Sequence, residues 1–124
     1  MEVKKGLFYA ETHEWVMFNP DGTALVGISD HAQDAMGDVA FVNLCDEGET
    51  FAAGDVIGDI ESIKAVSDVY SPVGGTVTKV NDALLDSPEL LNSAPYDSWL
   101  IELTDVVKND SLMDAEAYEA FIAE

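Results

Sequence analysis

The division of the chain into short apolar runs constrains its fold more than any other feature. Seven runs of five to eight residues, rich in Val, Ile and aromatic residues, are separated by turn-forming residues. Runs of this length and composition are typical of strands in a small sandwich or barrel. We therefore expect a mainly β fold with strands near residues 14–18, 23–28, 39–44, 56–63, 65–70, 76–80 and 98–103.

The turn between the first two runs has a clear signature. In "NPDG", at residues 19–22, Pro20 presets its own φ and Gly22 accepts a positive φ, so this stretch is expected to close a hairpin. No Pro/Gly/Ser-rich linker or shift in composition divides the 124 residues, and 48% of them are apolar. A single domain over residues 1–124, with a real core, is the expectation.

Two short helices are predicted between the runs. In "SDHAQDAMG", Asp30 is the candidate N-cap, Gln33 reaches back to it, and Gly37 ends the helix with a positive φ. In "SPELLN", Ser87 is the candidate cap of a single turn with Pro88 at its first position, ending near residue 92.

A longer helix is predicted at the C-terminus, over about residues 111–123. Tyr118, Phe121 and Ile122 follow one another at helical spacing and form one apolar stripe. Acidic residues stand near the start of the segment, where they favour the helix dipole. We expect this helix to pack on the β domain and to have no direct role in function.

The charge of the chain restricts its partners. Five lysines stand against 25 acidic residues, which gives a formal net charge of −20. Such a surface repels nucleic-acid backbones and anionic lipid surfaces, and it suits transient docking with basic proteins. No apolar run is long enough to cross a bilayer, and the like-charged surface favours a monomer in the free state. Cys45 is the only cysteine, so neither an internal disulfide nor a thiolate metal cluster can form.

One of the rare lysines stands in a distinctive place. Two β-rich runs meet at Ile63 and Lys64 in "DIESIKAVSDVY", so a hairpin there would place Lys64 at its accessible tip. Ile63-Lys64 lacks the Gly or Asn of the favoured two-residue turns, so a tighter or looser loop stays open. An exposed lysine is protonated at neutral pH and is a poor nucleophile by itself, but it is a good acceptor for a modifying enzyme.

The sequence around this lysine resembles a known family. "GDIESIKAVSDVYSPVGGTV" is similar to the lipoyl-lysine segment of the glycine cleavage system H proteins, which belong to the biotinyl/lipoyl-domain group. "THEWV", "GISDHAQDAMGDVAFVNL", "LLNSAPYDSWLIEL" and "LMDAEAYEAFI" resemble further blocks of the family, in the same order. The resemblance covers nearly the whole chain and implies a lipoyl-domain-like hybrid barrel-sandwich.

The resemblance also implies a function. Lys64 would carry lipoate as an amide, and the protein would be a non-enzymatic carrier. It would take the aminomethyl group of glycine from the pyridoxal-phosphate decarboxylase (P protein) to the aminomethyltransferase (T protein). Dihydrolipoamide dehydrogenase (L protein) would reoxidise the lipoate, and separate enzymes would attach it.

The aminomethyl cargo is hydrolysed readily in water, so the resemblance implies a sheltering cleft. Glu14 is either the candidate counter-ion for the cargo's ammonium or an ordinary exposed acid on a strand, and Thr12 is a candidate hydrogen-bond partner. Ala35 stands where some family members have a histidine, and alanine cannot make that polar contact. The remaining candidates are Glu61 and Asp68, for recognition by the attaching enzyme or for solubility, and Gly75. With Gly74, Gly75 resembles the family's glycine position opposite the hairpin, and an ordinary turn after Pro72 fits the two glycines equally well.

Three alternatives remain beside this interpretation. Biotin carriers share the architecture but flank their lysine with methionines, whereas Ile63 and Ala65 stand here. An H-like protein could instead pass lipoate to other lipoyl-dependent complexes, and an acidic interaction domain could leave Lys64 unmodified.

His13 and His31 do not have a useful zinc spacing, so no metal site is expected. Without an apolar signal core or an Arg-rich leader, a bacterial cytoplasm is expected rather than a mitochondrial matrix.

Overall fold

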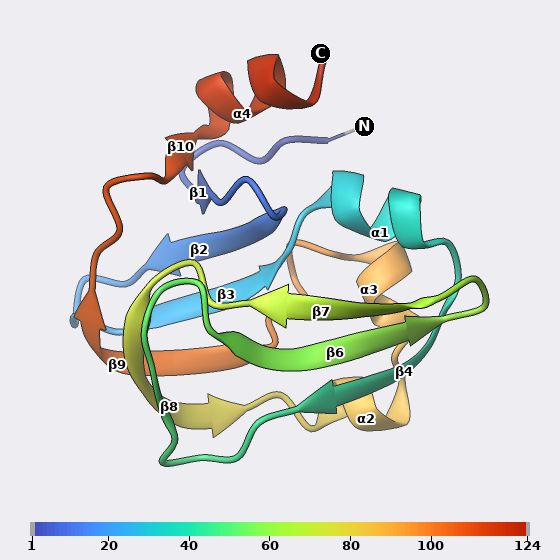
Figure 1. Ribbon diagram of the computed structural model, residues 1–124, viewed down its shortest axis with the longest axis horizontal. Helices are drawn as coiled ribbons and strands as arrows, with labels where there is room; N and C mark the ends of the chain where they lie inside the picture. The colour runs from blue at the N-terminus through green and yellow to red at the C-terminus, as the bar shows by residue number, and fades with distance from the viewer. Residues whose placement is uncertain (1, 124) are drawn as a thin grey trace.

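A computed structural model describes residues 2–123 as two antiparallel sheets with four helices around them (Figure 1). The strands are β1 Phe8–Tyr9, β2 Glu14–Phe18, β3 Ala24–Ile28, β4 Val39–Leu44, β5 Thr50–Phe51, β6 Val56–Ser62, β7 Val66–Tyr70, β8 Gly74–Val80, β9 Ile101–Val107 and β10 Met113–Asp114. The helices are α1 Asp30–Met36, α2 Ala83–Asp86, α3 Leu90–Ser93 and α4 Ala115–Ile122. The larger sheet has the order β10-β1-β2-β3-β9-β8-β5 and the smaller one the order β4-β6-β7.

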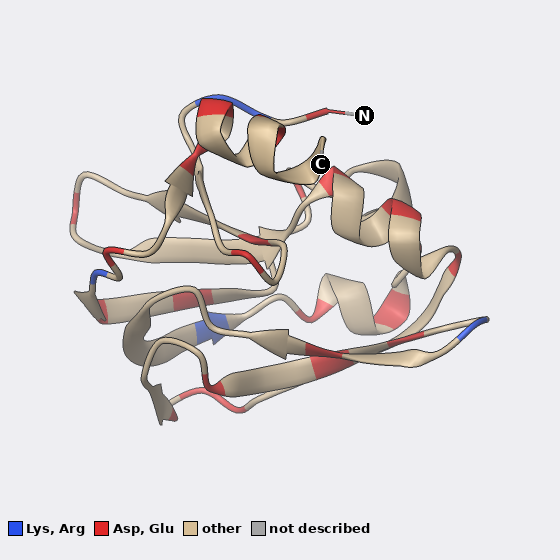
Figure 2. Ribbon diagram, turned by 45° about the horizontal axis from the view of Figure 1, so that its top comes forward, with Lys and Arg blue, Asp and Glu red and all other residues tan. Residues whose placement is uncertain are grey.

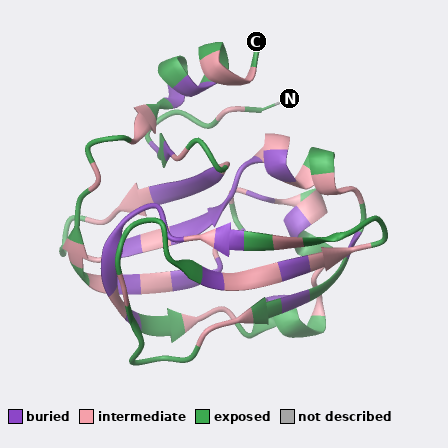
Figure 3. Cartoon of the chain, viewed as in Figure 1, coloured by how far each residue is buried: buried purple, intermediate pink, exposed green. Residues whose placement is uncertain are grey.

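The main core joins the two sheets. Val16, Val26 and Leu103 from the larger sheet belong to the same buried cluster as Val42 and Ile60 from the smaller one. In β4 the buried residues are Val39 and Val42, and in β6 they are Ile57 and Ile60, three positions apart in each strand because the register shifts there (Figure 3). Both sheets thus bury one face against a shared core, as a sandwich of two sheets requires. The predicted mainly β barrel-sandwich fold is confirmed.

A second core lies beneath the C-terminal helix α4. Tyr9 and Tyr118 are fully buried there and stack with ring centroids 4.4 Å apart, and Trp15 belongs to the same cluster. Phe121 and Ile122 pack against it, so the predicted apolar stripe does face the β domain. In Figure 1, α4 lies beside the N-terminal segment, at the β1 edge of the larger sheet. Packing on this cluster therefore ties the C-terminal part of the chain to its N-terminal part.

Several predicted boundaries were wrong. The C-terminal helix begins at Ala115, not near residue 111, because Met113 and Asp114 pair with β1 as strand β10. The last long strand is Ile101–Val107, whereas residues 98–103 were expected. The two-residue strands β1, β5 and β10 were missed because pairing with a neighbour defines them and no apolar run marks them.

The cap of α1 was also misassigned. Ser29, rather than Asp30, is the N-cap: its backbone is extended and its Oγ accepts a hydrogen bond from the amide of Ala32. Asp30 is already helical, and its carboxylate accepts a hydrogen bond from the side chain of Gln33. Gly37 ends the helix with φ of 77°, as predicted. The correct cap was hard to choose because Ser and Asp are adjacent and cap helices about equally well.

The "SPELLN" helix also starts later than predicted. Residues 87–89 form a turn, and α3 runs from Leu90 to Ser93. The preceding helix α2 was not predicted at all, because four residues are too few to show a period of 3.6. Within residues 2–123, every helix is too short or too polar to cross a membrane.

Gly58, in the middle of β6, offers a test of how closely the strands of the smaller sheet approach. A Cβ atom at this position would overlap the backbone carbonyl oxygen of Asn43 in β4. We expect Gly58→Ala to lower the free energy of unfolding by roughly 2–3 kcal/mol, because backbone atoms would have to move apart. Chemical denaturation measures the loss.

Gly22→Ala is the matched control for this substitution. Gly22 has φ of 91°, and no atom lies within 4 Å of the position that an added Cβ would occupy. Only the left-handed backbone then disfavours alanine, at a cost of about 1 kcal/mol. Equal losses in the two variants would contradict the close approach of β4 and β6.

Candidate functional site

The hairpin of β6 and β7 carries Lys64 at its tip. Three residues, Ile63 to Ala65, connect the strands, so the loop is longer than a two-residue turn. The Oγ of Ser62 accepts hydrogen bonds from the amides of Lys64, at 3.2 Å, and of Ala65, at 3.3 Å. The amide of Ile63 donates to the carbonyl of Asp38 at 3.1 Å. The loop at the tip is therefore held by the side chain of Ser62 and by a backbone hydrogen bond to Asp38, in the segment that follows α1.

The side chain of Lys64 is exposed and lies over Gly37, at the end of α1. A Cβ atom at Gly37 would be 3.2 Å from Cε of Lys64 and 3.5 Å from its Nζ. Asn92 of α3 holds this glycine from beneath, because its side chain donates to the Gly37 carbonyl at 2.9 Å and accepts from the amide of Val39 at 2.9 Å. The primary amine thus rests on a fixed backbone surface, next to solvent.

A cavity of about 260 Å³ opens beside this lysine. It lies between three walls: the turn that enters β2, helix α1 and the inner side of the hairpin. Most of the α1 wall is apolar, whereas the β2 wall and the hairpin contribute polar groups. The lining residues are Thr12, His13, Glu14, Ile28, Ala32, Ala35, Met36, Ser62, Lys64, Ala65, Ser67, Asp68 and Val69.

Glu14 is the buried polar group of this cavity, with 2% of its surface exposed. Its carboxylate accepts hydrogen bonds from the hydroxyl of Thr12 and from the amide of Tyr70. Burial nevertheless raises the pKa of Glu14 from 4.5 to about 7, and these hydrogen bonds offset only part of that effect. A carboxyl group with this pKa favours a cation beside it, because a nearby positive charge removes the cost of ionising it.

The other predicted residues fall into two groups. Asp68 and Ala35 line the cavity with Thr12 and Glu14, so the structure brings these four together near Lys64. Ala35 contributes a methyl group to the α1 wall, where it cannot donate or accept a hydrogen bond.

Glu61 and Gly75 lie outside the cavity lining. Glu61 is on β6, three residues before the lysine, and its carboxylate accepts from the side-chain amide of Asn43 at 3.2 Å. Gly75 is in the larger sheet, on β8, where it pairs with Phe51. A Cβ there would lie 2.9 Å from the carbonyl oxygen of Thr104, so the glycine allows close packing of β8 on β9.

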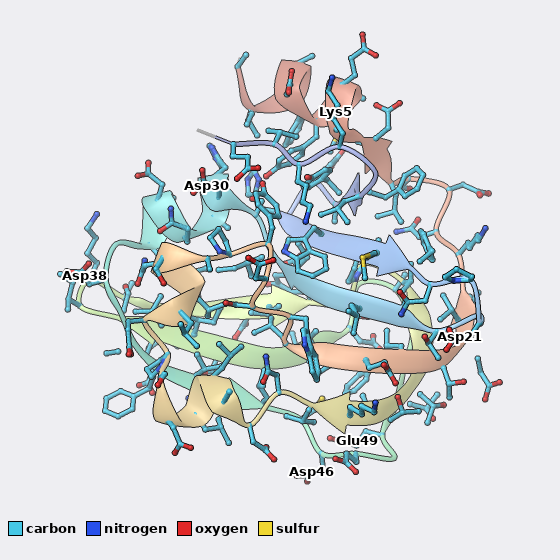
Figure 4. The ribbon with its side chains drawn as sticks, turned by 180° about the vertical axis from the view of Figure 1, so that it is seen from behind. Lys5, Asp21, Asp30, Asp38, Asp46 and Glu49 are labelled. Atoms are coloured by element: carbon cyan, nitrogen blue, oxygen red, sulfur yellow. The ribbon has the colours of Figure 1, made fainter. Side chains whose placement is uncertain are left out.

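The acidic residues are spread over the whole surface. Figure 2 shows red segments on both sheets and on the helices, with one blue segment at the tip of the β6–β7 hairpin. In Figure 4 the side chains of Asp30 and Asp38 lie towards one side of the molecule, and those of Asp46 and Glu49 lie close together at its lower end. A partner with a basic surface is therefore attracted from many directions, while the hairpin tip presents a cation.

A larger cavity, of about 550 Å³, lies between the N-terminal segment and α4. Lys5, Asp114, Glu116 and Glu119 provide its charged lining. Among residues 2–123, no group of three or more His, Cys, Asp or Glu side chains is placed to hold a metal ion. The cavity beside Lys64 is therefore the site where the predicted residues and a buried ionisable group meet.

Comparison with known proteins identifies the family. Residues 7–124, which include the hairpin and all three cavity walls, match the family model described as "Glycine cleavage H-protein". The chain belongs to the glycine cleavage H-protein family. H proteins are the carrier component of the glycine cleavage system and not one of its enzymes, as the sequence predicted.

Relatives of the H-protein family match almost the full chain. "Glycine cleavage system H protein 2" of Pseudomonas putida is 53% identical over 120 residues, covering 95% of this chain and 94% of its own. "Probable glycine cleavage system H protein" of Thermococcus kodakarensis is 50% identical and covers 98% of this chain and 92% of its own. The crystal structure of a glycine cleavage system H protein from Mycobacterium marinum superposes with a TM-score of 0.90 at 34% identity, covering 98% of this chain and all of that one.

Three contributors to the site were not identified as such from the sequence. Ser62 shapes the hairpin tip, and a serine just before a turn is a signal that could have been read. Asn92 was interpreted only as a helix stop, although its side chain holds Gly37. His13 lines the cavity with φ of 77°, a conformation that no sequence pattern indicates for a histidine.

Proposed function

We propose that this H protein carries lipoate as an amide on Lys64 and shuttles the aminomethyl group of glycine between the P and T proteins. The L protein would reoxidise the lipoate. One observation carries the proposal: the exposed amine of Lys64 stands at the mouth of a cavity in which Glu14 is buried. A solvent-exposed amine is accessible to an enzyme that attaches lipoate. A buried carboxyl group in the adjoining cavity can bind a cationic cargo at the end of the attached arm.

The chemistry of the cavity fits this cofactor. Ala32, Ala35 and Met36 offer an apolar wall to a hydrocarbon chain tethered at Lys64. When bound, lipoate supplies a dithiolane that can be reduced while it accepts the one-carbon unit. This chain's residues supply the tether, the wall and the charge.

Glu14 would hold the ammonium of the cargo inside the cavity, where the apolar α1 wall limits its contact with water. An ammonium beside the carboxylate lowers the pKa of Glu14 from about 7, so cargo and carboxylate favour each other's charged forms. Thr12 orients the carboxylate through its hydroxyl, and Asp68 adds negative charge to the cavity lining. Shelter of this kind slows hydrolysis of the cargo between enzymes.

Enzymes that attach lipoate must recognise the hairpin before any arm exists. Glu61 and Asp68 lie on β6 and β7 behind the lysine, and we propose them as contacts for a basic surface on such an enzyme. For Gly75, we propose only an indirect role, through the packing of the larger sheet. The whole carrier would be one domain over residues 1–124, monomeric when free, and located in a bacterial cytoplasm.

Intact mass spectrometry of the native protein tests the attachment. We expect a mass increase of one lipoyl group, located on the peptide that contains Lys64. An unmodified Lys64 in cells with working lipoate enzymes would contradict the proposal and would favour a plain acidic interaction domain. A biotinyl group on Lys64 would also contradict the proposal, because it would identify the protein as a biotin carrier.

An exchange assay tests the place in glycine cleavage. Purified P protein, glycine and labelled bicarbonate are expected to show CO2 exchange that depends on the lipoylated protein. Lipoylation without exchange would favour a relay that passes lipoate to other complexes.

A further inference from the structure

We propose that Tyr118, on the C-terminal helix, is a positioning residue for the cavity, acting on Glu14 through His13 and on α1 through Ser29. This inference rests on the proposed function and assigns the helix a role beyond packing. Tyr118 lies outside the cavity lining, and its aromatic ring is fully buried in the second core. Its hydroxyl group is the part that reaches the two cavity walls.

The hydroxyl of Tyr118 contacts both walls at hydrogen-bond distance. Its oxygen is 2.7 Å from Nδ1 of His13, in the turn that enters β2, and 2.8 Å from Oγ of Ser29, the N-cap of α1. The backbone joins the same two residues, because the amide of Ser29 donates to the carbonyl of His13 at 3.0 Å. One phenol therefore links two elements that are separated in sequence.

The available protons and acceptors determine which group donates in the two hydrogen bonds of the Tyr118 hydroxyl. Ser29 Oγ accepts a hydrogen bond from the amide of Ala32. Among residues 2–123, the hydroxyl oxygen of Tyr118 is the acceptor available to the hydroxyl proton of Ser29. Ser29 then donates to Tyr118, and Tyr118 donates to Nδ1 of His13. The opposite direction would leave the buried Ser29 hydroxyl proton without an acceptor, and donation by both Ser29 and His13 would leave the buried Tyr118 hydroxyl proton without one. His13 is thus a neutral ring with its proton on Nε2.

The environment of His13 supports the neutral form. Burial and the neighbouring His31 ring, whose centroid is 4.5 Å away, lower the pKa of His13. Phe121 of α4 covers another side of the ring, with centroids 6.0 Å apart. A neutral His13 places no second cation beside Glu14, so the carboxyl group stays available to the cargo.

Fixing His13 also fixes the direction of Glu14. His13 has φ of 77°, which is unfavourable for a residue with a side chain and persists only where the surroundings enforce it. Its amide donates to the carbonyl of Ala10 at 2.9 Å, and β2 begins at the next residue. The hydrogen bond from Tyr118 holds the ring of His13 in place. The backbone turn at His13 directs the side chain of the next residue, Glu14, into the cavity.

Tyr118→Phe removes the hydroxyl and keeps the ring, and Tyr9→Phe is its matched control. Tyr9 stacks on Tyr118 and is equally buried, but its hydroxyl donates to the carbonyl of Lys4, away from the cavity. We expect normal lipoylation in both variants and about fivefold faster hydrolytic loss of the aminomethyl cargo in Tyr118→Phe alone. Equal acceleration in the two variants, or none in Tyr118→Phe, would overturn the proposal.

The ring of His13 gives a readout that is independent of the cofactor. In ¹⁵N NMR spectra of the unmodified protein, Nδ1 of His13 is expected to be unprotonated, and in Tyr118→Phe to shift towards the protonated value as the tautomers mix. Tyr9→Phe should leave the signal unchanged. A protonated Nδ1 in the original protein would refute the assignment. Absence of lipoate on Lys64 would refute only the proposed function.

Discussion

Replacing Lys64 with arginine is expected to abolish lipoyl attachment and, with it, all glycine-dependent CO2 exchange. A guanidinium keeps the positive charge and the exposure of the lysine, but it stays protonated at any physiological pH and offers no free amine to acylate. The side chain of Lys64 is exposed at the hairpin tip, so the free energy of unfolding should change by less than about 0.5 kcal/mol.

Intact mass and CO2 exchange check this expectation, with Lys79→Arg as the control. Lys79 is also exposed and lies on a strand, β8, of the other sheet. Its substitution should leave both the lipoyl mass and the exchange rate unchanged. A lipoyl mass on Lys64→Arg would locate the attachment elsewhere. A collapsed circular dichroism spectrum would show that the lysine supports the fold and is not a free tip.

Replacing Glu14 with glutamine is expected to raise the free energy of unfolding at high pH and, at the same time, to weaken the protection of the cargo. The raised pKa of about 7 means that the folded protein binds a proton that the unfolded chain, with a value near 4.5, has already released. Ionised Glu14 therefore costs stability progressively between pH 4.5 and 7, and the full cost remains above pH 7. At about 1.4 kcal/mol per pKa unit, this cost amounts to roughly 3 kcal/mol.

Glutamine removes that cost and keeps an acceptor for the amide of Tyr70. Glu14→Gln should therefore be more stable than the original protein at pH 8 and about equally stable at pH 4. Thermal unfolding across this pH range measures the difference. A constant difference at every pH would contradict a buried carboxyl group with a raised pKa.

The same substitution should weaken the shelter of the cargo. Without a carboxylate to balance the cargo's ammonium, we expect hydrolytic loss about tenfold faster, while lipoylation at Lys64 stays normal. Glu11→Gln is the control, because Glu11 is exposed and lies outside this cavity. Equal rates of loss in the two variants would remove Glu14 from the proposed mechanism.

The sequence predicted the elements whose signal is local. The β2–β3 turn, the β6–β7 hairpin and the positive φ at Gly37 all appear where short-range patterns placed them. Short-range patterns failed for β1, β5 and β10, which exist only because distant segments pair. The cap of α1 was misassigned because Ser29 and Asp30 offer nearly equal capping groups, and packing against Tyr118 favours the serine.

By itself, the amino-acid sequence determined the mainly β class, the hairpin with Lys64 at its tip and the acidic surface, because periodicity, turn chemistry and charge depend on neighbouring residues. Only the tertiary structure decided that Glu14 is buried, that Asp68 shares its cavity while Gly75 does not, and that Tyr118 reaches His13 over 105 positions. These properties depend on desolvation and on contacts between segments far apart in the chain. The local pattern of residues does not specify either of them.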